Sequence, residues 1–178
     1  MKKTLLLSLL LTSTLFGYSY NELLIQAQSS IFPKILLLDK KLDDKLIDGT
    51  IVYTIVCEEN DYHTAEKLRD AMNAQYQNHL NGYTFEVNIL LFSELTSSSR
   101  ATAIYVLNSD SGIDKVIQLA KTSGSVTFAY DMVNLQQGVL LSLMVEKSTV
   151  LYLSKKSLQT HNVDFAKSLY QIVRVTDD

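Results

Sequence analysis

The feature that most constrains this chain is a repeated alternation of strand-like and helix-like segments. Residues 50–56 are β-branched and aromatic, as expected of a central strand, and residues 61–76 follow with apolar side chains at helical spacing. The order then repeats, with strands expected at 83–92 and 101–107 and an amphipathic helix from residue 113 that ends at Gly124. Such alternation predicts a sheet with helices on its faces.

The pattern changes in the last third of the chain. After a short strand at 125–130, two apolar runs at 138–145 and 149–153 flank Glu146, Lys147 and Ser148, which indicates a β-hairpin. A short helix from Lys155 and a final helix through Phe165, Leu169, Ile172 and Val173 are expected to complete the chain. The sequence therefore predicts a single α/β domain over residues 18–178, with a mostly parallel sheet flanked by helices and a C-terminal β-hairpin and helix.

The first seventeen residues are typical of a secretory signal peptide. Lys2 and Lys3 precede thirteen uncharged residues that include seven leucines, and small residues follow at Gly17 and Ser19. The alternative is a transmembrane anchor, but a spanning helix needs about 20 apolar residues and this run is shorter. We expect residues 1–17 to be cleaved, within a few residues, and the protein to be periplasmic without inserting into the membrane.

Charge and motifs exclude several function classes. The formal net charge is −3, and loss of the first seventeen residues, which hold two lysines and no acid, makes it −5. An acidic domain is a poor partner for nucleic acid. The glycines stand apart, so no dinucleotide-binding or phosphate-binding loop is present, and no cofactor is expected.

Candidate catalytic and metal-binding residues are few. Cys57 lies beside Glu58 and Glu59, whose charges raise the pKa of a thiol, so a structural cysteine is favoured over a nucleophile. An intermolecular disulfide is the other option for a lone exported cysteine. The three histidines lie far apart in the sequence and predict no metal site. We expect no enzymatic activity.

Two segments are candidate ligand-binding residues. Ser98, Ser99 and Arg100 could bind an anion through hydroxyl groups and a guanidinium, although an ordinary polar loop explains them as well. Asp131 follows the strand at 125–130, where open α/β sheets bind ligands, although a turn would also favour Asp. Together they predict an anionic solute at the carboxyl edge of the sheet.

The C-terminal half resembles the YfiR (HmsC-like) family. The similarity lies in SVTFAYD at 125–131, in Gly138-Val139-Leu140 and in the hairpin LSLMVEKSTVLYLS followed by a last helix. The run IVYTIVCEENDY at 51–62 is similar to that family's first strand and following helix start, and residues 30–38 occupy the place of its N-terminal helix.

The resemblance implies a periplasmic α/β protein, often dimeric, that binds the periplasmic sensor region of an inner-membrane signalling protein. That partner would typically be a diguanylate cyclase of cyclic-di-GMP signalling, and a sensor kinase is the other option. The family's cysteines fall near Thr54 and Ala101 here, and Cys57 stands where glycine is common, so the family's disulfide control does not carry over.

Regulation of such a partner is the function that the sequence favours, with small-molecule binding as the alternative. For partner binding, the candidate surfaces are the acidic stretch at Asp43, Asp44 and Asp48 and the hairpin tip at Glu146 and Lys147. A solvated acidic face is the simpler explanation of the first stretch.

Overall fold

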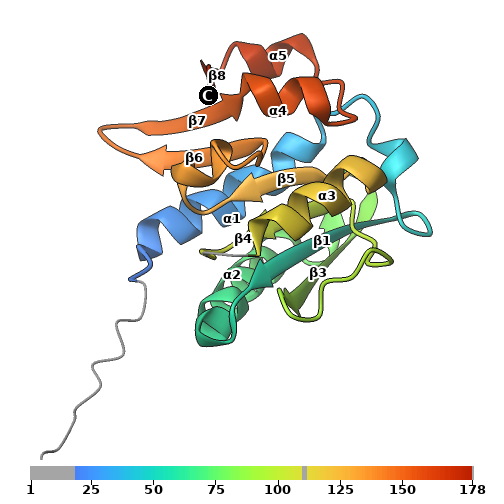
Figure 1. Ribbon diagram of the computed structural model, residues 1–178, viewed down its shortest axis with the longest axis vertical. Coiled ribbons are helices and arrows are strands. Elements are labelled where there is room, and N and C mark those ends of the chain that lie inside the picture. The colour runs from blue at the N-terminus through green and yellow to red at the C-terminus, as the bar shows by residue number, and fades with distance from the viewer. Residues whose placement is uncertain (1–18, 110–111, 178) are drawn as a thin grey trace, which may run out of the picture.

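Eight strands form one sheet in the computed structural model, which describes residues 19–109 and 112–177 (Figure 1). The predicted signal peptide, residues 1–17, lies outside the described residues. The strands are β1 (Thr50–Cys57), β2 (His79–Leu80), β3 (Tyr83–Leu91), β4 (Ala103–Val106), β5 (Val126–Ala129), β6 (Leu141–Val145), β7 (Thr149–Ser154) and β8 (Val173–Thr176).

The strand order is β2-β3-β1-β4-β5-β6-β7-β8. Strand β1 pairs in parallel with β3 on one side and with β4 on the other, and β5 and β6 continue the parallel run. The hairpin β6–β7 is antiparallel, as are β2 and β3, while β8 runs parallel to β7. The predicted α/β domain with a mostly parallel sheet and a late hairpin is confirmed.

Helices cover both faces of this sheet (Figure 1). The α-helices are α1 (Glu22–Leu36), α2 (Tyr62–Tyr76), α3 (Ile113–Ser123), α4 (Lys155–Thr160) and α5 (Lys167–Tyr170). Short 3₁₀ turns are η1 (Asp43–Lys45), η2 (Glu59–Asp61) and η3 (Met132–Leu135). The side chain of Asn21 caps α1 by accepting from the backbone N–H groups of Leu23 and Leu24.

The alternation of side chains along the strands divides the core into two layers. In β1, Tyr53 and Ile55 pack with α1 and α2, while Val56 faces α3 with Ile104 of β4. Phe32 of α1 stacks on Phe128 of β5 with ring centroids 4.6 Å apart. The central strands β1, β4 and β5 are therefore buried on both faces of the sheet.

The C-terminal segment differs from the prediction. The expected final helix through Val173 stops at Tyr170, and Val173–Thr176 form strand β8 beside β7. Val173 pairs with Leu151, and Val175 pairs with Leu153. Residues 173–176 include two valines and have little local preference for a helix. Pairing with the free side of β7 therefore determines their conformation.

Candidate functional site

The carboxyl edge of the parallel strands is the candidate site. From β1 the chain crosses through α2 to β3 on one side, and β4 then pairs on the other side of β1. The strand order therefore reverses between β1 and β4. Open α/β sheets form a ligand crevice at the carboxyl ends of the two strands where the order reverses. The residues that follow β1, β4 and β5 line this edge.

Polar contacts join the loops after β1 and β4. The hydroxyl of Ser109 donates to Glu58 Oε1 at 2.6 Å and accepts from the backbone N–H of Gly112 at 2.9 Å. The short segment after β4 is thereby tied both to the loop after β1 and to the start of α3.

Tyr20, which precedes α1, covers the same edge. Its hydroxyl accepts from the backbone N–H of Asn108 at 3.3 Å and hydrogen-bonds the carboxylate of Asp61. Its ring packs edge-on against Tyr130, with centroids 4.8 Å apart, and the Tyr130 hydroxyl accepts from Asn21 N at 2.8 Å. The segment before α1 is thus held over the ends of β1, β4 and β5.

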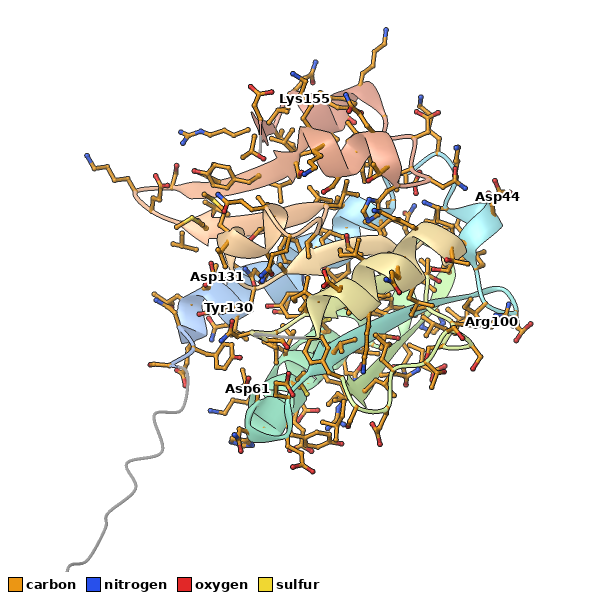
Figure 2. All side chains as sticks on the ribbon, viewed as in Figure 1. Asp44, Asp61, Arg100, Tyr130, Asp131 and Lys155 are labelled. Atoms are coloured by element: carbon orange, nitrogen blue, oxygen red, sulfur yellow. The ribbon has the colours of Figure 1, made fainter. Side chains whose placement is uncertain are left out.

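Burial raises the pKa of the Asp61 carboxyl above its ordinary value. Nearby Glu58 raises this pKa further, and the hydrogen bond from Tyr20 opposes the shift because it stabilises the charged form. Figure 2 shows Asp61, Tyr130 and Asp131 on the side of the molecule where strands β1 and β5 end.

A groove of about 430 Å³ opens between α1 and α2 beside Tyr20. Tyr20 and apolar, polar and charged side chains from both helices line it; the helical residues are Glu22, Ile25, Gln26, Thr64, Lys67 and Ala71. Lys67 Nζ lies 4.0 Å from Glu22 Oε1, and the side chains are 56% and 83% exposed, respectively. Such an exposed pair is weak, so both charged groups are available to a ligand.

The residues predicted to bind an anion are not brought together. Ser98, Ser99 and Arg100 precede β4 and lie at the amino edge, whereas Asp131 follows β5 at the carboxyl edge. Figure 2 shows Arg100 and Asp131 at opposite ends of the sheet. The prediction that these residues share the carboxyl edge is wrong for the loop residues, since β4 and β5 run in the same direction.

Within their own loops these residues have local roles. The side chain of Asp131 accepts from the backbone N–H of Val133 at 3.1 Å and caps η3. The hydroxyl of Ser99 accepts from the backbone N–H of Thr96 at 3.1 Å.

The predicted partner-binding residues also separate. Asp43, Asp44 and Asp48 precede β1 at the amino edge, and Asp43 accepts a hydrogen bond from the Tyr83 hydroxyl at 2.8 Å. Glu146 and Lys147 join β6 to β7 beyond the carboxyl edge, since β6 runs parallel to β5. The two candidate partner-binding surfaces therefore lie at opposite edges of the sheet.

Cys57 is buried at the end of β1, and its pKa is raised to about 12. Burial is the largest cause, followed by the charges of Asp61, Glu58 and Glu94. A thiol held in the protonated form is a poor nucleophile, in agreement with the structural role expected from the sequence. The described residues contain no group of three or more potential metal ligands.

The sequence did not predict three features of the structure. These are the position of Tyr20 over the carboxyl edge, the groove between α1 and α2, and a buried ion pair between Asp39 and Lys45. In the ion pair, the side chains are 0% and 3% exposed. The flanking Leu42 and Leu46 were a signal that Lys45 could turn inward. Tyr20 had no such local signal, because its contacts lie on distant loops.

Comparison with known proteins gives the fold alone. No family model and no curated protein matches the chain. A conserved domain protein from Vibrio cholerae O1 biovar eltor is 11% identical, with a TM-score of 0.61 over 86% of this chain and 60% of that one. The ABC domain in complex with L-Trp from Streptococcus pneumonia is also 11% identical, with a TM-score of 0.54 over 80% of this chain and 60% of that one.

The chain therefore spans less than two thirds of these neighbours, which share its α/β architecture. Across residues 19–109 and 112–177, no helix is both long and apolar enough to span a membrane.

Proposed function

We propose that this protein is a binding module that takes a small zwitterionic solute, of amino-acid size, in the groove between α1 and α2. The observation that carries the proposal is the placement of Glu22 and Lys67 on facing helices of one groove. An ammonium group of the solute would bind the Glu22 carboxylate, and a carboxylate group would bind the Lys67 ammonium.

The rest of the groove suits such a ligand. Ile25 and Ala71 supply apolar surface, Tyr20 supplies an aromatic ring, and Gln26 and Thr64 supply hydrogen-bonding groups. Its volume of about 430 Å³ falls in the range of small-molecule sites. The fold similarity to a domain bound to L-Trp supports the choice of amino acids as the first class to test.

Thermal-shift and calorimetric titration with the amino acids, and with simple carboxylates and amines alone, would test this function. A solute at 100 times its Kd adds about 2.7 kcal/mol to the stability. We expect Lys67→Ala to lose the shift and Lys34→Ala, a change at the far end of α1, to retain it. The absence of any shift in the unmodified protein, or an equal shift in Lys67→Ala, would overturn the proposal.

A second function, favoured by a different observation, is that of a periplasmic regulator. Leu23, Tyr62, Val133 and Val145 are exposed apolar residues around the carboxyl edge, as on a surface that binds another protein. Under this proposal residues 1–17 direct export, and the domain binds the periplasmic region of an inner-membrane diguanylate cyclase or sensor kinase. Both proposed functions are binding rather than catalysis.

Affinity purification of the tagged protein from solubilised membranes would test the regulatory function. Recovery of a membrane signalling protein is the expected result. Repeated recovery without one, or detection of the uncleaved chain in the cytosol, would refute it.

A further inference from the structure

We infer that the carboxyl edge of the sheet binds a protein segment that presents basic residues around an apolar strip. This inference rests on the regulatory function proposed above and defines the chemistry of the partner. The surface concerned, called here the carboxyl-edge patch, consists of Leu23, Tyr62, Val133 and Val145 with the acids that accompany them.

The apolar members of the patch come from four separate elements. Leu23 is 68% exposed at the start of α1, Tyr62 is 42% exposed at the start of α2, Val133 is 52% exposed in η3 and Val145 is 45% exposed at the end of β6. Each element begins or ends at the carboxyl edge, so the four residues follow one side of the molecule, from the start of α2 to the end of β6 (Figure 1).

Each apolar side chain has an acid within two residues of it in the sequence. The pairs are Glu22 with Leu23, Asp61 with Tyr62, Asp131 with Val133, and Glu146 with Val145. Two lysines reduce the negative charge of the patch, since Lys67 lies near Glu22 and Lys147 lies at the hairpin tip. Glu58 and Glu59, which follow β1, add negative charge to it.

This chemistry selects among the candidate occupants. An acidic patch repels a second copy of itself and also repels anionic lipid headgroups. Basic side chains on a partner are attracted to it, while the partner's apolar side chains cover the exposed Leu, Tyr and Val. A basic, amphipathic segment is therefore the complementary occupant.

A second group of exposed apolar residues provides a matched control. Tyr170, Ile172 and Val175 are 45%, 60% and 49% exposed in or near β8, the last strand in the sheet order. Their charged neighbours are the basic Lys167 and Arg174 and the acidic Asp177, which pairs with Lys155 at 2.8 Å. The two groups match in residue type and exposure and differ in neighbouring charge.

The experiment uses a fluorescent helical peptide of leucine and lysine, compared with a peptide in which glutamate replaces lysine. Binding to the full domain is measured by anisotropy at low and high salt. The carboxyl-edge variant combines Leu23→Ser, Tyr62→Ser and Val133→Ser, and the control combines Ile172→Ser, Tyr170→Ser and Val175→Ser. Thermal unfolding first establishes that both variants fold.

We expect the lysine peptide to bind in a salt-sensitive manner and the glutamate peptide not to bind. Because the carboxyl-edge variant removes three apolar contacts at once, it should bind about tenfold more weakly or worse, a loss of about 1.4 kcal/mol, and the control should bind as the unmodified protein does.

Equal binding of both peptides, no loss in the carboxyl-edge variant, or an equal loss in the control would overturn the inference. It would also be overturned if the carboxyl-edge variant abolished dimerisation or adsorption to phosphatidylglycerol vesicles, since those results would identify a second copy or a membrane as the occupant. Failure to recover a membrane partner would refute the regulatory function without changing the peptide result, so the two failures are distinguishable.

Discussion

Removal of the Asp39 carboxylate should destabilise the domain strongly. Its side chain and that of Lys45 are almost fully buried and form an ion pair. Among the described residues, Asp39 is the only hydrogen-bond acceptor for Lys45 Nζ. Burial already lowers the pKa of Lys45, and Asp39 opposes that shift. Asp39→Ala would leave a buried ammonium group without its counter-charge.

Removal of Asp39 and removal of Lys45 should lower the free energy of unfolding by different amounts. Loss of one partner from a buried pair typically costs about 3–5 kcal/mol, and we expect Asp39→Ala to lie in that range. Lys45→Met should cost less, about 2 kcal/mol, because the remaining carboxylate still accepts from the backbone N–H groups of Lys41 at 3.1 Å and Asp164 at 3.0 Å. The double variant should cost less than the sum of the single changes.

Urea unfolding at neutral pH, followed by circular dichroism, measures these free energies. The exposed pair Lys40–Asp164, with side chains 56% and 52% exposed, is the matched control, and Lys40→Met should cost less than about 1 kcal/mol. A larger loss for Lys45→Met than for Asp39→Ala, or strict additivity in the double variant, would refute the reasoning.

Three further expectations concern buried polar groups. Cys57, whose pKa is raised to about 12, should resist Ellman's reagent in the folded protein and react once guanidinium unfolds it; rapid reaction in the native state would contradict its burial. Burial lowers the pKa of His161 from 6.5, so the unfolded chain binds the proton more readily, and stability should fall as pH drops below 6.5 towards the folded-state pKa. His161→Gln should lose that part of the pH dependence, and identical slopes for both proteins would exclude this role. Gln28→Met removes side-chain hydrogen bonds to the backbone oxygens of Tyr130 and Leu143 and one from a buried tyrosine hydroxyl, so it should cost about 3 kcal/mol in urea unfolding; a cost below about 1 kcal/mol would contradict it.

Local patterns in the sequence determined the order and type of most elements. The β-branched run of β1, the helical spacing in α2 and Gly124 at the end of α3 each act through neighbouring residues. Gly124 adopts φ +75, which glycine accommodates without strain. The hairpin β6–β7 likewise forms from residues adjacent in sequence. These signals were sufficient to predict the α/β class and the late hairpin.

The tertiary structure alone decided which polar residues meet. Tyr20 meets Asn108 across 88 residues of sequence, and no pattern near either residue indicates the other. Arg100 and Asp131 are closer in sequence than that pair, yet strand direction places them at opposite edges of the sheet. The conformation of β8 likewise depends on a distant partner, since β7 supplies its hydrogen bonds. Side-chain periodicity reports on contacts within an element, whereas a site depends on strand order and direction, which long-range pairing determines.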